Sequence, residues 1–315
     1  MKVLITGGAG FVGSHLTDRL IGRGDDILVI DNYATGRRDN LPDSAQGLRV
    51  VEGDIADGSL VDEWFDAFGP DVVVHAAASY KDPGDWAEDV RTNVLGSVHV
   101  TKAAQATGVR RLIYLQTALC YGLHPIEQPI TLDHPIRPGD SSYAISKTAG
   151  EQYIALSGID YQSFRLANAY GPRNISGPLP TFYSRLTGGK PCFVMDTRRD
   201  FVYISDLVDV LEKAVDGAGR TGAYHVSSGG DYSIQELFDS TVAAMGITLD
   251  KPVEVRPRGA DDAFTILLDP TDTTRDFEWQ ATVPLATGVA EAIAYYRAYG
   301  ITGTYTHLKL DALRA

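Results

Sequence analysis

Short apolar runs alternate with helix-like segments along the first half of the chain. The apolar runs cover residues 3–6, 27–30, 48–51, 72–75, 112–116 and 161–166. Between most of them, apolar residues recur with helical spacing, as over 60–68, 93–106 and 143–157. Strands that are apolar on both faces are typical of a parallel sheet that helices cover on both sides. The pattern therefore predicts an α/β fold built on a doubly wound parallel sheet.

This alternation breaks after residue 167, where prolines and glycines interrupt a mixed region. Strand and helix signals resume over 201–204, 224–226, 234–245 and 284–296. We therefore expect two lobes. The larger, nucleotide-binding lobe would cover 1–167 with a returning segment near 200–227. A smaller, discontinuous lobe over 168–199 and 228–315 would bind the substrate, in a crevice outside the carboxyl ends of the strands.

The first strand runs straight into a glycine-rich turn, Gly7-Gly-Ala-Gly10-Phe-Val-Gly13, and a helix-like segment follows. The glycines permit a tight turn and let backbone N–H groups approach a pyrophosphate at the positive end of the helix. The next strand ends in Asp31, which is placed to bind the adenosine ribose hydroxyls. This Rossmann-like opening predicts a dinucleotide site. The carboxylate favours NAD over NADP, although Arg37 and Arg38 lie close by in sequence and leave NADP open.

Composition narrows the choice of partners. Lysine and arginine number 28 against 41 acidic residues, a net charge of −13 that argues against nucleic acid. The chain is 44% hydrophobic without a long uncharged run, so we expect no membrane span. Two cysteines, Cys120 and Cys192, fit neither a metal site nor a disulfide framework. With no evident secretory signal, the expected protein is cytoplasmic and holds no metal.

A tyrosine and a lysine four residues apart, Tyr143 and Lys147, open one of the predicted helices. That spacing puts both side chains on one helical face. A phenol has a pKa of about 10, so a tyrosine acting as a base near neutrality needs a shift of roughly three pKa units, or about 4 kcal/mol. The lysine ammonium and a cationic nicotinamide ring would together favour the phenolate. Thr117, at the end of a predicted strand, would orient a substrate hydroxyl toward the tyrosine.

Together these features resemble the extended short-chain dehydrogenase/reductase family, in its NAD-dependent nucleotide-sugar epimerase and dehydratase branch. The resemblance covers nearly the whole chain, and its further landmarks are residues 53–55, 75–78, 93, 117–122, 165–172 and 199–201. It implies NAD as the cofactor, a nucleotide sugar as the substrate, and a homodimer that forms through the helices at 93–106 and 143–157.

The resemblance also implies a role for each matching residue. The cofactor would contact Gly7, Gly10, Phe11, Val12, Gly13, Asp31, Asn32, Asp54, Ile55, Ala76, Ala78, Asn93, Tyr143 and Lys147. Of these, Asp54 and Ile55 would face adenine, while Ala76 and Ala78 would line the path to the nicotinamide. The substrate would contact Lys81, Thr117, Ala118, Leu119, Tyr143, Asn168, Phe193, Arg199 and Arg258. Asn168, Arg199 and Arg258 would hold the nucleotide diphosphate, and Phe193 would contact the base.

Several of these residues also have a purely structural interpretation, which the sequence leaves open. Asp54 could cap the next helix, and Asn168 could be an ordinary turn residue. Arg199 could pair with Asp196 or Asp200, Lys81 could be a solvated loop lysine, and Arg256 stands close enough to Arg258 to blur that assignment. For His15 and His75 we expect packing or capping roles, and for Cys120 a small apolar residue beside the site.

The residues directly after Thr117 separate the possible reactions. Enzymes of this branch first oxidise C4 of the sugar to a 4-keto group. Its dehydratases and decarboxylases then use an acidic residue just after the threonine. Here Ala118 and Leu119 stand at those positions, and neither side chain can transfer a proton. The simplest complete cycle is therefore return of the hydride to the opposite face of C4, which is 4-epimerisation.

Residues 80–86, 116–122 and 177–182 resemble uronate-type epimerases of bacterial polysaccharide and antibiotic pathways, such as moenomycin biosynthesis. The resemblance favours conversion of UDP-glucuronate to UDP-galacturonate. A 4-keto uronate loses carbon dioxide readily, so its carboxylate must be held out of alignment with the carbonyl. Candidate donors are Thr117 and the backbone N–H groups around Ala118 and Leu119. Lys81 is a candidate charged contact.

Three alternatives stay open at this point. The first is a UDP-glucose/galactose 4-epimerase, the second a nucleotide-sugar decarboxylase or dehydratase with its acid elsewhere, and the third a non-catalytic NAD-binding sensor. The loop 191–198 is shorter than is usual in the family and lacks its Gly-Asp-Gly turn. UDP is therefore favoured as the nucleotide without being fixed by a motif.

Overall fold

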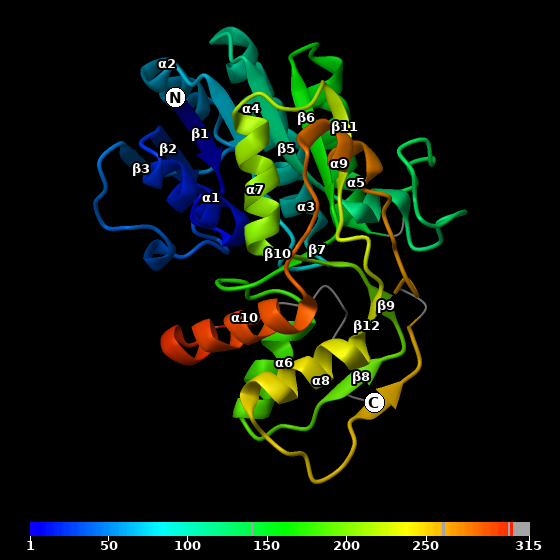
Figure 1. Ribbon diagram of the computed structural model, residues 1–315. Helices are drawn as coiled ribbons and strands as arrows, with labels where there is room; N and C mark the ends of the chain where they lie inside the picture. The colour runs from blue at the N-terminus through cyan, green and yellow to red at the C-terminus, as the bar shows by residue number, and fades with distance from the viewer. Residues whose placement is uncertain (140, 260–261, 302, 305–315) are drawn as a thin grey trace.

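The fold is built on one seven-stranded parallel sheet, in the order β11-β6-β5-β4-β1-β2-β3 (Figure 1). The computed structural model describes residues 1–139, 141–259, 262–301 and 303–304. The strands are β1 Lys2–Thr6, β2 Asp26–Asp31, β3 Leu48–Glu52, β4 Val72–His75, β5 Arg111–Thr117, β6 Tyr161–Leu166 and β11 Gly222–Val226. The six strands predicted from the apolar runs all belong to this sheet, which confirms the doubly wound, Rossmann-like fold. The strand order reverses between β1 and β4, and a crevice for a ligand forms at such a switch point.

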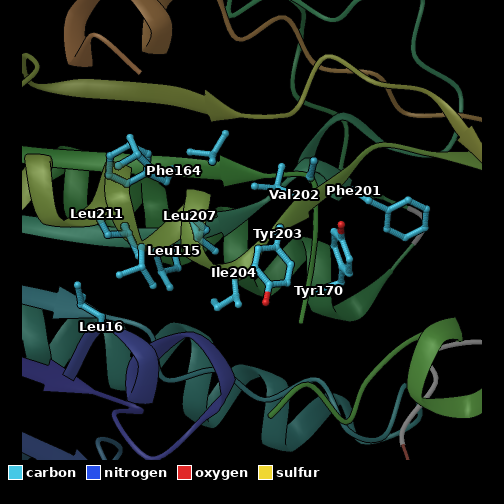
Figure 2. Close-up of a cluster of buried hydrophobic side chains, with 14 of the residues drawn as sticks. Leu16, Leu115, Phe164, Tyr170, Phe201, Val202, Tyr203, Ile204, Leu207 and Leu211 are labelled. Atoms are coloured by element: carbon cyan, nitrogen blue, oxygen red, sulfur yellow. The ribbon is translucent and has the colours of Figure 1, made fainter. Parts of the chain in front are cut away.

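Helices cover both faces because alternate residues of each strand point to opposite sides. Val3 and Ile5 face one hydrophobic core, and Leu4 faces another. The first core lies under α1 (Phe11–Gly22) and α7 (Ile204–Val215). Figure 2 shows Leu16 of α1 and Leu207 and Leu211 of α7 among its side chains. The second core lies under α2 (Gly58–Phe68), α4 (Ser97–Ala106) and α5 (Ser142–Leu156).

Most of the remaining elements gather beside the carboxyl edge of the sheet (Figure 1). Three helices lie there, α6 (Pro178–Thr187), α8 (Ile234–Met245) and α10 (Leu285–Tyr299), and α8 packs against both of the others. Short strand pairs accompany them: β7 (Asn168–Tyr170) with β10 (Phe201–Tyr203), β9 (Arg198–Arg199) with β12 (Tyr232–Ser233), and β8 (Phe193–Met195) with β13 (Glu254–Arg256). The short helix α9 (Thr271–Phe277) lies against β11. The first hydrophobic core continues through Tyr170 and Phe201 into α6, α8 and α10, so one core serves both parts.

One helical segment is longer than the sequence predicts. Helicity begins at Trp86, not at residue 93, and runs through α3 (Trp86–Asp89) and a π-helical stretch, Val90–Gly96, into α4. The Asp85 side chain caps α3 by accepting the Glu88 N–H at 3.1 Å. The apolar pattern missed this start because its first residues are mostly polar. Among the described residues, no helix is both long and apolar enough to cross a membrane.

Gly150 of α5 lies at a close contact with the π-helical stretch and with β5. A Cβ there would lie 2.7 Å from the Asn93 carbonyl oxygen and 2.8 Å from the Tyr114 hydroxyl. Overpacking of this kind costs about 1–3 kcal/mol, so Gly150→Ala should lower the free energy of unfolding by about 2 kcal/mol. Gly22→Ala is the matched control, because a Cβ at Gly22 meets nothing within 4 Å at the end of α1. Denaturant unfolding measures both, and equal stability of the two variants would contradict the close packing of α5.

Candidate active site

The glycine turn forms a cradle that only glycine backbone can line. Gly7 has φ +70°, and a Cβ there would lie 2.6 Å from the Ala77 nitrogen. A Cβ at Gly13 would lie 2.3 Å from the Gly7 carbonyl oxygen. Gly10 precedes α1 without a side-chain cap, so the first N–H groups of the helix face the turn. The cradle lies against Ala76 and Ala77 and fits a pyrophosphate held by backbone N–H groups.

Asp31 ends β2 beside this turn and is only 6% exposed. Its Oδ2 accepts the Ala9 N–H at 2.8 Å and its Oδ1 accepts the Tyr33 N–H at 2.8 Å. Burial raises the pKa of Asp31, and these hydrogen bonds oppose the rise. The carboxylate thus fixes the glycine turn, and its contact with the ribose stays a prediction. Arg37 pairs with Asp39 and Arg38 pairs with Glu52.

Asp54 and Ile55, the residues predicted to face adenine, follow β3. The Asp54 carboxylate accepts the Ala56 N–H at 2.8 Å and pairs with Arg91 at 2.8 Å. Burial alone would raise the pKa of Asp54, but these partners together with Asn32 lower it. The alternative role for Asp54 as a helix cap is wrong, because Asp57 caps α2. Ile55 is buried under Gly96.

Asn93 lies fully buried in the π-helical stretch and joins two walls of the site. Its Oδ1 accepts the Ser79 N–H at 2.8 Å, and its Nδ2 donates to the Ser79 carbonyl and the Ser146 hydroxyl, each at 3.0 Å. Both amide hydrogens are therefore used within the protein. These bonds give Asn93 a bracing role that ties the loop after β4 to α5, and its expected contact with the cofactor stays a prediction. A π-helical stretch often marks a functional site of this sort.

Tyr143 and Lys147 lie on the first turns of α5, which packs against β5 and the 3₁₀ helix η3 (Ala118–Tyr121). The Lys147 Nζ sits 4.0 Å from the centre of the Tyr114 ring, and the Tyr114 hydroxyl donates to the Lys147 carbonyl at 3.0 Å. These contacts fix α5 to β5, three residues before Thr117 closes that strand. The Tyr80 ring meets Tyr143 edge-on at 6.5 Å. Thr117, Tyr143 and Lys147 thus share the carboxyl edge of the sheet.

The pKa shifts of Tyr143 and Lys147 differ from those expected from the sequence. Burial, with Tyr80 and Asp89, raises the pKa of Tyr143 above its ordinary value. Burial lowers the pKa of Lys147 to about 7, against the opposing charge of Glu151. The protein alone therefore keeps the phenol protonated, and the lysine by itself does not supply the predicted phenolate. A phenolate at neutral pH requires further positive charge beside the ring, which an oxidised nicotinamide carries.

The donors expected after Thr117 are partly used within the chain. The Thr117 hydroxyl accepts the Leu119 N–H at 3.2 Å and so caps η3. The Leu119 N–H is therefore not the free donor that the sequence suggested for a sugar carboxylate. Ala118 is buried at the start of η3, where a helix presents its N–H groups.

Two of the predicted diphosphate residues, Arg199 and Arg258, both bind Asp262, one at its carboxylate and the other at its backbone carbonyl. Arg199 pairs with Asp262 and donates to the Ala263 carbonyl at 2.9 Å, while Arg258 donates to the Asp262 carbonyl at 2.6 Å. Burial lowers the pKa of Arg199, with Asp262 opposing and Arg258 adding to the effect. The alternative pairing of Arg199 with Asp196 or Asp200 is wrong. Asp200 instead binds the hydroxyls of Ser227 and Ser228.

The other predicted substrate residues are more dispersed. Asn168 is exposed at the start of β7 and donates to the Asp200 carbonyl at 3.1 Å, so it is a strand residue and not a turn residue. Phe193 begins β8, and one face of its ring is covered by Arg256 at 3.9 Å. Arg256 also pairs with Glu254, which separates its role from that of Arg258. Lys81 is exposed in the loop after β4.

The histidines and Cys120 serve the packing of the fold. His75 is fully buried, its Nδ1 2.7 Å from the Thr6 hydroxyl and its Nε2 2.9 Å from the Ser97 hydroxyl. Burial and Lys147 lower the pKa of His75 to about 3, so it stays neutral. His15 lies 3.0 Å from the Pro172 carbonyl oxygen. Burial raises the pKa of the Cys120 thiol to about 12, which leaves it inert.

Sequence reasoning missed two buried residues behind the site, Glu151 and His225. Glu151 lies one further turn along α5 from Lys147 and binds Arg165 and Gln116. His225, in β11, lies 2.6 Å from the Tyr121 hydroxyl. The signal for Glu151 was present, because the spacing of Tyr143 and Lys147 simply continues to it. His225 had no sequence signal.

Residues 3–227 match the family model described as NAD dependent epimerase/dehydratase family. The Bordetella bronchiseptica enzyme WbmH, solved with NAD⁺, is 53% identical and superposes with a TM-score of 0.92 over 95% of this chain and 99% of that one. WbmG from the same organism, solved with NAD and UDP, is 47% identical with a TM-score of 0.90 over 98% of both chains. A UDP-glucose 4-epimerase of Mycolicibacterium smegmatis is 32% identical over 94% of this chain and 99% of its own length.

The arrangement at Asp31 gives a test of the cofactor site. Asp31→Ser removes the ribose-facing charge and leaves the turn N–H groups of Ala9 and Tyr33 without their acceptor. The affinity for NAD, measured by calorimetry on protein stripped of cofactor, should fall at least about tenfold. Asp26→Ser, at the exposed opposite end of the same strand, is the control and should bind NAD as the parent chain does. Unchanged affinity in Asp31→Ser would contradict this placement of the ribose.

Proposed function

Because this chain belongs to the NAD-dependent epimerase/dehydratase family and uses NAD as its cofactor, we propose that it inverts the C4 hydroxyl of a UDP-sugar. The favoured reaction is UDP-glucuronate to UDP-galacturonate. The observation that carries the proposal is the placement of Tyr143 on the first turn of α5 and of Thr117 at the end of β5, two elements that pack against each other. A reaction that needs only one proton-transferring group at C4 is an inversion through a 4-keto sugar.

The surroundings of Thr117 support epimerisation over elimination. Ala118 and Leu119 occupy η3 directly after it, and neither carries a proton-transferring group. The nearby Cys120 thiol is held protonated by burial, which raises its pKa to about 12. A dehydratase or decarboxylase would need a second acid or base at C5 or C6. None of the residues on η3 supplies one at neutral pH.

Each catalytic residue has a defined task in this reaction. Thr117 orients the 4-hydroxyl, and Tyr143 takes the proton of that hydroxyl and later returns it to the 4-oxygen, while the hydride returns to the opposite face of C4. Lys147, fixed by its contact with the Tyr114 ring, places positive charge one helical turn from the phenol. NAD, when bound, would supply an acceptor for the C4 hydride that can also return it. Without the cation of oxidised NAD the buried phenol keeps its proton, so proton abstraction is linked to cofactor occupancy.

A uronate is favoured by the resemblance of segments 80–86, 116–122 and 177–182 to uronate-type epimerases. The first two of these border Tyr143 through the Tyr80 ring and through η3. Lys81 lies beside Tyr80 and is the proposed charged contact for the carboxylate. UDP is favoured because the WbmG structure at 47% identity contains UDP. Arg199 and Arg258, which converge on Asp262, are proposed to bind its diphosphate.

UDP-glucose/galactose is the second candidate substrate. It is favoured by the M. smegmatis UDP-glucose 4-epimerase, which is 32% identical over nearly its full length. The two candidates differ only at C6 of the sugar, where one carries a carboxylate and the other a hydroxymethyl group. A link to antibiotic or polysaccharide biosynthesis stays part of the uronate proposal.

We also propose that the enzyme is a homodimer through α5 and the helical segment that ends in α4. Ile145, Tyr153 and Leu156 of α5 are exposed apolar residues, as are Val90 and Leu95 of the neighbouring segment. α5 packs against the π-helical stretch and against α4, so these residues lie on neighbouring elements. Exposed apolar side chains on neighbouring elements are typical of a subunit interface.

The substrate proposal is tested by mixing the protein with UDP-glucuronate and UDP-glucose in separate samples. NMR should show UDP-galacturonate in the first sample, and slower or no conversion in the second. Tyr143→Phe is the matched control, and should lose at least about a hundredfold in turnover while keeping bound NAD. A pentose product or a 4-keto pentose from UDP-glucuronate would contradict epimerisation. Conversion of UDP-glucose alone would favour the second substrate, and no conversion of either would favour an NAD-binding sensor.

The dimer proposal is tested by placing a charge in the apolar group. Leu156 is 81% exposed in the single chain, and Leu156→Lys should convert the dimer to a monomer. Light scattering after size exclusion gives the molar mass of both forms. Ile126→Lys, at an apolar residue that is 64% exposed outside these helices, is the control and should stay dimeric. A dimeric Leu156→Lys or a monomeric parent would contradict the proposed interface.

A further inference from the structure

A buried network of hydrogen-bonded polar side chains lies behind the proposed active site, and Glu151 is at its centre. Tyr143, Lys147 and Glu151 follow one another at four-residue intervals along one face of α5. Lys147 and Glu151 are 1% and 5% exposed, so their charges interact with little screening. A carboxylate held this far from water is costly unless its oxygens are fully bonded. The contacts of Glu151 meet that requirement.

Glu151 binds one partner with each oxygen. Its Oε1 accepts from Arg165 of β6, from Nε at 3.2 Å and from Nη2 at 3.0 Å. Its Oε2 accepts from the Gln116 Nε2 of β5 at 3.0 Å. The Gln116 Oε1 in turn accepts the Thr117 backbone N–H at 2.8 Å. Glu151 is thus joined through one side chain to the residue proposed to orient the substrate.

At the other end of this hydrogen-bonded network, the contacts of His225 and Tyr121 fix which atom carries each proton. The His225 Nδ1 lies 3.0 Å from the Asp269 carbonyl oxygen, which only accepts, so Nδ1 carries the hydrogen. Burial lowers the pKa of His225 to about 4, so its Nε2 is an acceptor and receives the Tyr121 hydroxyl at 2.6 Å. Arg165 donates to that hydroxyl oxygen from Nη1 at 2.7 Å. No member is left short of a partner, which is typical of a network that fixes geometry.

The groups that face Lys147 come from three elements. Tyr114 of β5 lies under its Nζ, His75 of β4 interacts with its charge, and Tyr143 and Glu151 flank it on α5. Around Glu151 stand Arg165 and Tyr161 of β6 and Cys120 and Tyr121 of η3. Tyrosines, a neutral histidine and a protonated thiol carry no charge at neutral pH. The negative charge that faces the Lys147 ammonium therefore comes from Glu151.

We propose that Glu151 is a positioning residue of the active site, which holds Thr117 through Gln116 and maintains the ammonium form of Lys147 across one turn of α5. Burial lowers the pKa of Lys147 to about 7 even with Glu151 opposing the effect. Without the carboxylate charge, Lys147 would lose its proton at lower pH. The phenolate of Tyr143 would then lack its neighbouring cation. The proposal rests on the proposed function, because that function makes Tyr143 and Lys147 the reacting pair.

The direction in which the Tyr143 titration shifts distinguishes this role of Glu151 from a purely structural one. Ultraviolet absorbance of the NAD-bound protein reports phenolate, and subtraction of the same variant carrying Tyr143→Phe isolates Tyr143. If Glu151 maintains the lysine charge, Glu151→Gln should move the Tyr143 titration upward by about one pH unit. If Lys147 keeps its proton without Glu151, the loss of a negative charge would move the titration downward. A purely structural carboxylate would leave it in place.

Two controls complete the experiment. Asp160→Asn breaks the ion pair with Arg111 at 2.9 Å, which joins the same two strands at the opposite edge of the sheet, and should leave the titration unchanged. Gln116→Met cuts the link to Thr117 without changing charge, so it should lower kcat and leave the titration unchanged. If Glu151→Gln fails to fold because Arg165 is left unpaired, Glu151→Gln with Arg165→Met removes both charges and is titrated instead. Glu151→Asp should restore much of the parent titration.

The outcomes are separable from those of the substrate assay, because the titration needs no sugar. An upward shift in Glu151→Gln, with no shift in Asp160→Asn, supports the proposal whichever substrate the enzyme takes. An unchanged or downward titration overturns it, even if epimerisation of UDP-glucuronate is observed. Lack of activity with both sugars would overturn the proposed function and leave the effect of Glu151 on Tyr143 measurable.

Discussion

The arrangement of the site depends on the burial of the Lys147 ammonium against the Tyr114 ring. An unpaired charge in such a position would be expelled or neutralised, so the surrounding structure has to compensate for it. The ring face at 4.0 Å and the Glu151 carboxylate one turn away do so together. These contacts hold α5 against β5 and so place Tyr143 and Thr117 at the same edge of the sheet. A glycine at position 150 allows the close approach.

Burial also determines the protonation of Tyr143 and Lys147. It raises the pKa of Tyr143 and lowers that of Lys147 to about 7, so the protein without its cofactor keeps the phenol protonated. Positive charge on a bound, oxidised nicotinamide would then decide whether the phenol ionises. A base that exists only beside an oxidised cofactor cannot abstract a proton when no hydride acceptor is present. Burial thereby couples proton removal to oxidation, and the glycine cradle at Gly7 and Gly13 sets where that charge would lie.

The sequence predicted the sheet well because its strands are short, continuous apolar runs, and such runs are determined locally. It predicted the glycine turn and the spacing of Tyr143 and Lys147 for the same reason. It missed α6, since Pro178 and Pro180 indicate a break although prolines are tolerated in the first turn of a helix. The start of α3 and the short α9 lack an apolar period. The protein partners of Asn93, Leu119 and Arg199 could not be predicted, because they come from residues distant in sequence or from a turn that spacing alone does not show.

In the proposed reaction, one hydrogen atom leaves C4 of the sugar and returns to the opposite face of C4 without exchanging with water. A UDP-sugar that carries deuterium at C4 tests this directly when it is incubated with the enzyme in ordinary water. The account predicts that the 4-epimer keeps its deuterium at C4, as read by NMR or mass spectrometry. Loss of the label from C4 to water would contradict hydride transfer to the bound cofactor, and with it the assigned roles of Tyr143 and Lys147.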